Sequence, residues 1–360
     1  MTELPAALEK IDGDWIADLT EEMVKIPSVT LEETEICAFY ERQLVDLGLE
    51  VDVREVTPGR PNLYARVRGN GDGPTLMLNG HLDTIPNQTN QKCYRDGDLL
   101  YGRGTTDMKG GMAAVLGAAR ALIDDINDGR IAADRIVIVE GDDELWVMSM
   151  GSMVFNITLT PSNGGRHTQY VDFRDNPIRF TGDLIAAVAA RQDELDVNAV
   201  HPLAGAERID LGIVNAGDYF NRTPVSCRFT GTRRWSPGKS ADGVLEELRQ
   251  LVAPIAQAGG MTAEVTMEHE REPFDTPLDD PLVEAVGGAH QQLFDEDPRV
   301  IGRRIVGDAN LYVHGSGVPT IYYGPSNETA HADIENVSIT RVVDSARVYL
   351  LAAMKYCGVA

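Results

Sequence analysis

Four short segments of the chain carry side chains that could bind a metal ion or transfer a proton. The first contains His81 and Asp83 and follows the strand-like run Leu76–Asn79. An imidazole can bind a metal through one ring nitrogen while a nearby carboxylate orients the ring through the other nitrogen. His81 and Asp83 have a suitable spacing for these two roles. A single histidine is more often a structural residue, so this pair alone leaves both interpretations open.

The second segment is the glycine-rich stretch from Gly102 to Met112, which contains Asp107 directly before a helical pattern. The simpler interpretation of Asp107 is a helix N-cap. A carboxylate between tight turns and a helix start can also bridge two cations. The sequence therefore makes Asp107 a candidate metal ligand.

The third segment is acidic and the fourth contains a second histidine. The acidic segment (Glu140–Glu144) follows the β-branched run 135–139, and His331 ends the segment Gly324–His331 after a late strand. Acids at the end of a buried strand could supply a metal ligand and a general base. A solvated turn is the alternative interpretation of the acidic segment.

The elements that position these segments alternate between helices and strands. Strands are predicted at residues 49–56, 62–67, 75–79, 135–140 and 319–323, and helices around residues 16–23 and 36–47, after Asp107, and at 339–354. Loops at the carboxyl edge of such an α/β sheet commonly hold functional side chains. The predicted fold class of this part of the chain is therefore α/β.

A different pattern occupies the middle of the chain. The order is strand, helix, strand, strand, helix, strand, at residues 155–160, 184–195, 209–214, 225–232, 244–256 and 262–268. This order predicts an α+β domain of the ferredoxin-like type, inserted at residues 153–271. The catalytic α/β domain is then discontinuous and consists of residues 1–152 and 272–360.

Composition excludes several classes of partner. The chain has 32 Lys+Arg against 56 Asp+Glu and a net charge of −24, which repels nucleic-acid phosphates and anionic lipid. No apolar run approaches the ~18–20 residues of a membrane span, and Met1–Pro5 lack the pattern of a signal peptide. These features predict a cytoplasmic protein with no nucleic-acid or membrane partner. The scattered cysteines predict neither disulfides nor a cysteine zinc site.

The basic residues are mostly arginine, so the surface is predicted to be acidic and poor in lysine. This composition is typical of proteins from salt-loving organisms, in which ions screen the repulsion between carboxylates. An acidic enzyme from a GC-rich genome is the alternative interpretation.

Taken together and in this order, the four segments resemble those of the co-catalytic zinc aminoacylase, desuccinylase and carboxypeptidase family. This family includes acetylornithine deacetylase, succinyl-diaminopimelate desuccinylase and glutamate carboxypeptidases. The resemblance implies a zinc-peptidase-like catalytic domain with up to two zinc or cobalt ions per chain. It implies that His81 binds the first ion, that Asp107 bridges both, that Glu144 and His331 bind the second, and that Asp83 orients His81.

The resemblance also covers the inserted domain, which in this family is a lid and dimerisation domain. His167 is similar to the histidine that reaches the partner subunit's active site and stabilises the oxyanion. Asn221 and either Arg233 or Arg234 are similar to groups that hold the substrate, because a guanidinium fits the two oxygens of a carboxylate. The simpler interpretation of His167 is a loop residue, and that of the two arginines is a pair on the surface. The implied assembly is a homodimer.

Two departures from the family pattern affect the predicted mechanism. The family has paired glutamates, the first being the general base, where this chain has Asp143 before Glu144. Glu140 is the next candidate for the base. The chain also lacks about 20–30 residues after the acidic segment, the length of one helix and one strand. In the family that strand ends in a Glu-Pro-Thr-like turn that completes the first zinc site.

Two functions follow from these observations. The first is a zinc amidohydrolase that acts on an N-acyl amino acid or a short peptide, and the ordered motifs favour it. The second is a degenerate, non-catalytic family member that dimerises and binds acyl-amino acids without turnover. The absent ligand segment and Asp143 favour this second function. Motifs do not define the acyl group, because pocket shape determines substrate choice.

Overall fold

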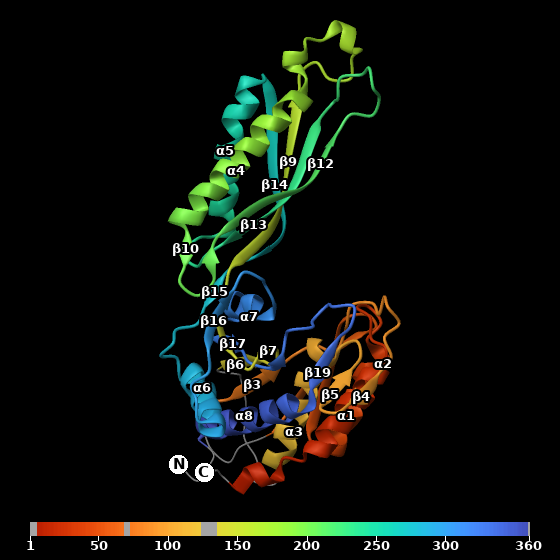
Figure 1. Cartoon of the computed structure of the whole chain (residues 1–360), viewed down its shortest axis with the longest axis vertical. Helices are drawn as coiled ribbons and strands as arrows, with labels where there is room; N and C mark the ends of the chain where they lie inside the picture. Colours follow the sequence, from red (N-terminus) through yellow and green to blue (C-terminus); the bar gives the residue numbers. More distant parts are fainter. Residues whose placement is uncertain (1–5, 68–72, 124–134, 359–360) are drawn as a thin grey trace. The chain divides into compact units, whose positions relative to one another are not determined.

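The chain forms two compact units, shown in Figure 1. The computed structural model describes residues 6–67, 73–123 and 135–358. The first unit comprises Met1–Val147, Thr276–Val300 and Gly317–Ala360. Met1–Pro5, on which the prediction about a signal peptide rests, lie outside the described residues.

The second unit comprises Met148–Asp275 and Ile301–Ser316. The insert predicted at residues 153–271 falls within it. The second unit also takes in residues 301–316, which sequence patterns had placed with the catalytic domain.

A mixed sheet forms the centre of the first unit. Its strands lie in the order β8 (Leu145–Ser149), β17 (Thr320–Tyr322), β6 (Arg135–Ile138) and β3 (Leu76–Asn79). Strand β6 pairs in parallel with both β3 and β17, and β8 pairs antiparallel with β17. The side chains of residues 136–138 are buried, as expected for a central strand covered on both faces.

Helices of the first unit pack against one another around this sheet. They are α1 (Gly13–Lys25), α2 (Thr34–Asp46), α3 (Gly110–Ile123), α6 (Pro281–Phe294) and α8 (Ile339–Cys357). Helix α8 packs against α1, α3 and α6. Its first turn is capped by Ser338, whose hydroxyl accepts a hydrogen bond from the backbone N–H of Arg341. This cap fixes the start of α8 and with it the position of Arg341.

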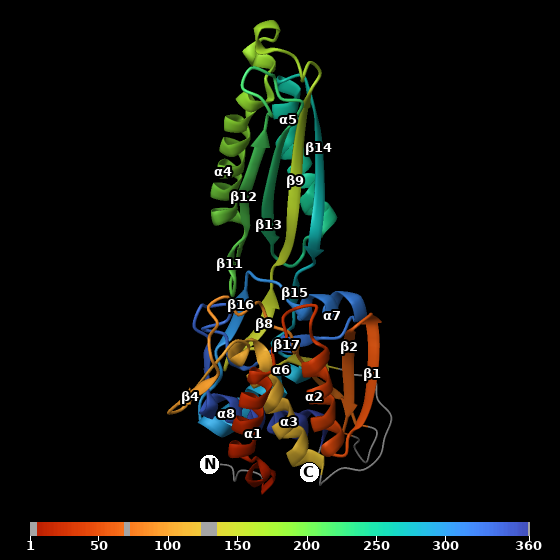
Figure 2. The ribbon, with the colours of Figure 1, turned by 90° about the vertical axis from the view of Figure 1, so that its right-hand side faces the viewer.

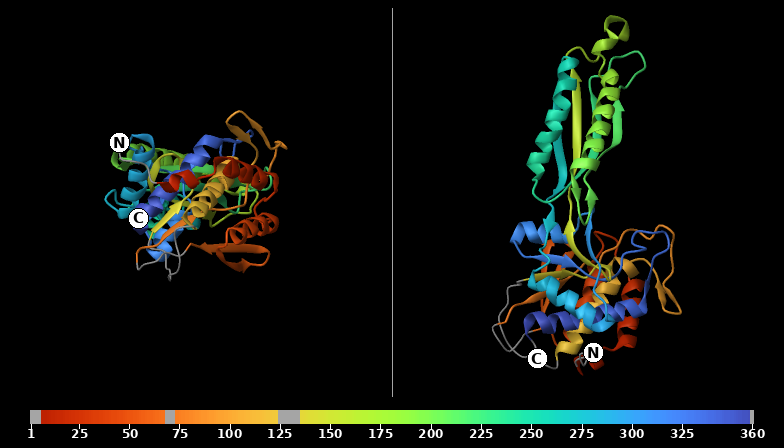
Figure 3. Two further views of the ribbon diagram at one scale, coloured as in Figure 1. Left: turned by 90° about the horizontal axis from the view of Figure 1, so that it is seen from below. Right: turned by 60° about the vertical axis from the view of Figure 1, so that its left-hand side comes forward.

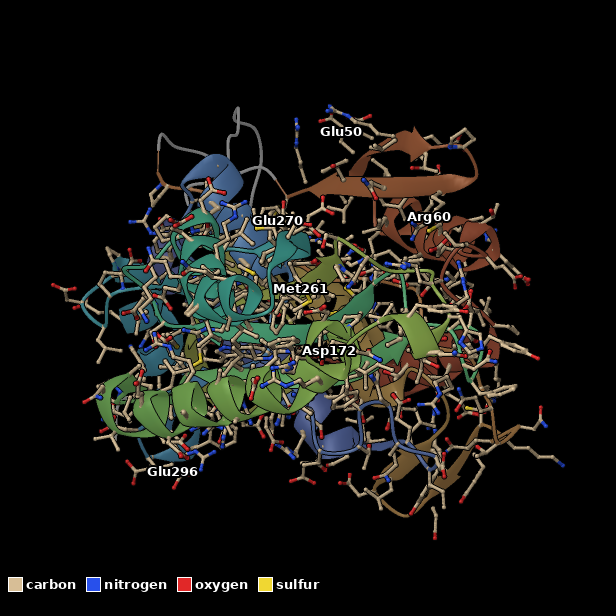
Figure 4. All side chains as sticks on the ribbon, turned by 90° about the horizontal axis from the view of Figure 1, so that it is seen from above. Glu50, Arg60, Asp172, Met261, Glu270 and Glu296 are labelled. Atoms are coloured by element: carbon tan, nitrogen blue, oxygen red, sulfur yellow. The ribbon has the colours of Figure 1, made fainter. Side chains whose placement is uncertain are left out.

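Short elements complete the first unit. A hairpin of β1 (Glu50–Thr57) and β2 (Arg60–Arg66) packs against α2. Glu50 and Arg60, labelled in Figure 4, begin its two strands. The remaining elements are β4 (Tyr94–Asp96), β5 (Leu99–Tyr101), β7 (Gly141–Asp142), β18 (Pro325–Ser326), β19 (Asn336–Ser338), the 3-10 helix η1 (Ala6–Lys10) and the π-helical turn η2 (Thr105–Lys109).

The second unit is an antiparallel sheet covered by two helices. The sheet order is β12 (Arg208–Ala216), β13 (Cys227–Trp235), β9 (Gly151–Pro161) and β14 (Met261–Arg271). Figures 2 and 3 show α4 (Thr181–Asn198) and α5 (Ala241–Ala258) along one face of this sheet. Buried and exposed residues alternate along β13, so one face packs on the helices and the other faces solvent. The chain order β-α-β-β-α-β is that of a ferredoxin-like domain.

The remaining elements lie outside this sheet, and two of them, β15 (Phe274–Asp275) and β16 (Val300–Arg303), pair with β8. The others are β10 (Val200–His201), β11 (Gly205–Ala206), α7 (Asp308–Ser316) and the 3-10 turns η3 (Thr168–Tyr170), η4 (Phe173–Asp175) and η5 (Pro177–Phe180). Among the described residues, no helix combines the length and the apolar character needed to span a bilayer.

Strand β8 corrects one prediction from the sequence. The sequence indicated that both a helix and a strand are missing after the acidic segment. The structure has a strand, β8, directly after this segment. All five of its residues are buried, and β9 begins two residues after it ends. Within the described segment 135–161 only the helix is absent. Met150-Gly151-Ser152 follow β8 and contain no carboxylate.

Candidate active site

His81 lies just beyond the end of β3, at the edge of the sheet where the parallel strands end. A Cβ atom on Gly80 would lie 2.6 Å from the side chains of Met108 and Met112, which would have to move to admit any other residue. The Nδ1 atom of His81 lies 3.0 Å from the carbonyl oxygen of Asp83 and 3.3 Å from its Oδ1 atom. The hydroxyl of Thr30 donates to Oδ2 of Asp83 at 2.6 Å. The imidazole is therefore oriented, with its Nε2 atom directed to another partner.

That partner is Asp107. Its Oδ1 atom lies 2.9 Å from Nε2 of His81, and its Oδ2 atom lies 3.1 Å from Nε2 of His331. The Asp107 side chain is 17% exposed, whereas that of His331 is 64% exposed, so solvent reaches the group at His331. Each carboxylate oxygen has its own imidazole. This is the arrangement expected of a carboxylate that bridges two cations.

Charge and hydrogen bonding shift the titration of this group. Burial opposes protonation of His81, but hydrogen bonds with Asp107 and Asp83 outweigh it and raise the pKa of His81 to about 11. The hydrogen bond with His81 lowers the pKa of Asp83 to about 2. Burial acts to raise the pKa of Asp107, yet the contacts with His81 and His331 hold it below its ordinary value. A cation that binds here must therefore displace a proton.

Two aspartates of the acidic segment are bound by one arginine of α8. Arg341 donates from Nε to Oδ2 of Asp143 at 2.6 Å and from Nη2 to Asp142. Asp143 has a φ of +54°, and its N–H donates to the carbonyl oxygen of Gly324 at 2.8 Å. Burial raises the pKa of Asp143 to about 6, although Arg341 opposes this rise. The carboxylate of Asp143 is thus directed to α8.

A third acid of the segment, Glu144, also has an arginine partner. Glu144, predicted to bind a metal with Asp107 and His331, pairs with Arg299. Among the described residues, no group of three or more His, Cys, Asp or Glu side chains has a geometry that could hold a metal ion. The side chains therefore fit a metal centre in part. The Asp107 carboxylate has one imidazole at each oxygen, and Glu144 is engaged elsewhere.

One buried carboxylate of this region was missed in the sequence. Glu335 is 1% exposed and accepts hydrogen bonds from the backbone N–H groups of Thr106 and Asp107. It also pairs with Arg103 at 2.7 Å. Its partners lie more than 220 residues away in the chain, so no local spacing identifies it. The only signal in the sequence is an acid four residues after His331.

In the second unit, the structure brings together two of the predicted residues. The Nδ2 atom of Asn221 lies 3.2 Å from Nε2 of His167, and Nδ1 of His167 accepts a hydrogen bond from the backbone N–H of Gln169. Both predicted residues lie on loops and are solvent-accessible. This pair can donate hydrogen bonds to an incoming oxygen, and its predicted part in catalysis stays a prediction.

The two arginines of β13 differ in their surroundings. Arg233 is 1% exposed and pairs with Glu207 at 2.6 Å inside the second unit. Its guanidinium is satisfied there, so these contacts support a structural role in place of the predicted substrate contact. Arg234 donates from Nη1 to the carbonyl oxygen of Arg304 at 2.6 Å and is half-buried. A substrate-binding role for Arg234 stays a prediction.

Residues 77–355 match the sequence profile of peptidase family M20/M25/M40. The match covers more than half of the chain and includes His81, Asp107, the acidic segment and His331. The chain therefore belongs to this family of hydrolases. The resemblance inferred from the four segments is confirmed.

Curated relatives include enzymes named for the removal of an acyl group. N-formyl-4-amino-5-aminomethyl-2-methylpyrimidine deformylase of Bacillus subtilis is 23% identical over 376 residues, covering 88% of this chain and 87% of its own. Succinyl-diaminopimelate desuccinylase of Cereibacter sphaeroides is 26% identical over 381 residues, which cover 92% of this chain and 96% of the relative. Acetylornithine deacetylase of Aliivibrio salmonicida is 27% identical over 277 residues, which cover 67% of this chain and 72% of the relative.

Solved structures share the fold across nearly the whole chain. Aminopeptidase PepT from Bacillus cereus has a TM-score of 0.78 at 19% identity and covers 96% of this chain and 99% of its own. The YXEP protein of Bacillus subtilis is described as a dinuclear metal-binding peptidase of the M20 family. It has a TM-score of 0.72 at 15% identity, and the match covers 97% of this chain and 99% of its own. The predicted α/β fold class is thereby confirmed.

Proposed function

We propose that the chain is a metal-dependent amidohydrolase that removes the acyl group of an N-acyl amino acid or cleaves a short peptide. The observation that carries this proposal is the Asp107 carboxylate, held with one oxygen at His81 and the other at His331. Membership of a hydrolase family supports it. The names of the relatives favour an acetylornithine deacetylase or succinyl-diaminopimelate desuccinylase type of reaction.

The proposed cofactor is zinc or cobalt, with up to two ions per chain. His81 and Asp107 would hold one ion, and Asp107 and His331 the other. Glu144 is the candidate for a further ligand because its partner Arg299 is 72% exposed, and exposed ion pairs contribute little stability. When bound, such ions polarise an amide carbonyl and make water a stronger nucleophile near neutral pH.

Asp143 is the proposed proton acceptor. Arg341 holds its Oδ2 atom, while its Oδ1 atom is buried and has no hydrogen-bond partner among the described residues. A carboxylate fixed at one oxygen can take a proton at the other and deliver it to the leaving amine. Glu140, just beyond the end of β6, is the alternative acceptor.

The proposed assembly is a homodimer in which each copy lends His167 to the other copy's centre. His167 and Asn221 are in contact and accessible, so they can donate hydrogen bonds to a developing oxyanion. Light scattering at micromolar concentration tests this proposal. A monomer that retains full activity would remove the role of His167 in a second copy.

A non-catalytic family member is the second candidate function, and the ion pairs of the acidic segment favour it. Asp142, Asp143 and Glu144 each have an arginine partner. If these pairs persist in solution, none of these three acids is available to a cation or a water molecule. Such a protein would bind acyl-amino acids without turnover.

One experiment separates the two functions. Protein loaded with Zn²⁺ or Co²⁺ is assayed with N-acetyl and N-succinyl amino acids and with short peptides, beside its zinc content by elemental analysis. The amidohydrolase proposal predicts turnover of at least one substrate that Asp107→Asn abolishes. Absence of turnover in the metal-loaded wild type with every substrate supports the non-catalytic function.

A further inference from the structure

Glu335 binds the backbone that carries Asp107. It lies directly before β19 and is 1% exposed. Its Oε1 atom accepts hydrogen bonds from the backbone N–H groups of Thr106 at 2.9 Å and Asp107 at 3.2 Å, and its Oε2 atom accepts one from Nη1 of Arg103 at 2.7 Å. A buried carboxylate with three donors strongly restrains each of them, because a hydrogen bond to an ionised group is stronger than a neutral one.

The same cluster reaches the loop that carries His331. Arg103 donates from Nη2 to the carbonyl oxygen of Ala332 at 2.8 Å. The hydroxyl of Thr106 donates to the carbonyl oxygen of Asn336 at 2.6 Å. The two loops are therefore joined around one carboxylate, although they are far apart in the sequence.

We propose that Glu335 is a positioning residue that ties the loop of Asp107 to the loop of His331 and so holds the Asp107 carboxylate between the two imidazoles. Ligands on loops need such support, because a functional side chain must be held within about 0.5 Å of its working geometry. This inference rests on the proposed function, since it treats Asp107 as a bridging ligand.

The substitution Glu335→Gln tests the carboxylate with almost no change in shape. The amide oxygen of glutamine can keep the hydrogen bonds to Thr106 and Asp107 or face Arg103, but its NH₂ group then faces a donor on the other side. One of the two connections must break. We therefore expect the loop of Asp107 to loosen while the fold persists.

The chain contains a matched control in the second unit. Glu207 is also 1% exposed, accepts a backbone N–H from Ser236 at 3.0 Å and pairs with Arg233 at 2.6 Å. Glu207→Gln thus removes the same kind of buried carboxylate from a cluster that belongs wholly to the other unit. Both variants should lose stability. Only Glu335→Gln should also change the backbone that carries Asp107.

The first readout is hydrogen exchange of the full-length, metal-free protein. For Glu335→Gln we expect the amides of Thr106 and Asp107 to exchange faster by about tenfold or more, since their acceptor is weakened. Glu207→Gln should leave the exchange of these two amides unchanged. Equal exchange in wild type and Glu335→Gln would overturn the proposal.

The second readout is the affinity for Zn²⁺ alone, measured by competition with a chelating dye. Loss of a residue that orients a ligand costs about 10–100-fold in metal affinity, so we expect this loss for Glu335→Gln and none for Glu207→Gln. An unchanged affinity in Glu335→Gln, or an equal loss in Glu207→Gln, contradicts the positioning role.

A milder variant covers the case in which Glu335→Gln does not fold. Arg103→Lys keeps a cation beside Glu335 but loses the forked contact to Ala332, so we expect a smaller increase in the exchange of Thr106 and Asp107. Wild-type exchange in this variant would overturn the proposal. If the wild type binds no Zn²⁺, the proposed function fails, and exchange in the metal-free protein still decides whether Glu335 holds the loop.

Discussion

Two acidic parts of the candidate site are neutralised in different ways. Asp107 has an imidazole at each carboxylate oxygen, at 2.9 and 3.1 Å. Asp142 and Asp143 share the guanidinium of Arg341. Histidine gives up its proton and then becomes a metal ligand, whereas arginine stays protonated and cannot act as one.

The difference shows which carboxylates are available to a cation. A cation that binds between Asp107 and His81 replaces the proton that these two side chains share. At Asp143 it must compete with Arg341, which is 29% exposed and held on a capped helix. This difference supports the proposed metal site at the histidine group and a fixed ion pair at the acidic segment.

The largest effect is expected from Asp107→Asn. The amide can offer an oxygen to one histidine, but its NH₂ group faces the other, so the bridge is lost. We expect the metal affinity to fall by more than about 100-fold, beyond the loss typical of a residue that only orients a ligand. Hydrolysis should fall below detection. Metal titration and a deacylation assay measure the two effects, and Asp142→Asn serves as the control with unchanged metal affinity.

The next effect concerns Asp143 as proton acceptor. Asp143→Asn should lower the rate of hydrolysis by about 10²–10⁴-fold, the contribution typical of a general base, with metal affinity preserved. Asp143→Glu should keep or raise the rate, because the added methylene extends the reach of the carboxylate. Retention of most activity in Asp143→Asn would move the base to Glu140.

Arg341→Met is expected to act on stability. It leaves Asp142 and Asp143 without their partner in a partly buried site, and we expect the free energy of unfolding to fall by about 1–3 kcal/mol. Arg347→Met, which breaks a single ion pair with Asp344 on the same helix, should cost about 1 kcal/mol or less. Urea denaturation measures both, and equal losses would show that Arg341 has no special role.

The smallest effect is expected from Arg299→Met. The lost ion pair is exposed on the arginine side, so stability should change by less than about 1 kcal/mol. If Glu144 is a ligand, removal of its competitor should raise the Zn²⁺ affinity by up to about fivefold, which corresponds to the same energy. An unchanged affinity would indicate that Glu144 does not bind the metal.

Much of the histidine group could be predicted from the sequence. His81 and His331 follow strand-like runs, and Asp107 lies in a glycine-rich turn before a helix. These are local patterns, and local patterns determine where strands and turns occur. The ferredoxin-like order of the second unit was visible for the same reason.

The ion pairs could not be predicted, because their partners are distant in the sequence. Arg341 lies 198 residues from Asp143, and an isolated arginine has no characteristic spacing. Strand β8 was missed for a different reason. Met150 alone separates it from β9, so no turn signal divides the continuous apolar run into two strands.

Titration of metal-free protein with Zn²⁺ by calorimetry tests the central claim most directly, that Asp107 with His81 and His331 forms the metal site. The account predicts that wild type and Asp142→Asn bind Zn²⁺ with equal affinity and release a proton, because the His81 imidazole must be deprotonated. It predicts that Asp107→Asn loses this binding. Zn²⁺ binding to Asp107→Asn with wild-type affinity, or its loss in Asp142→Asn, would contradict the account.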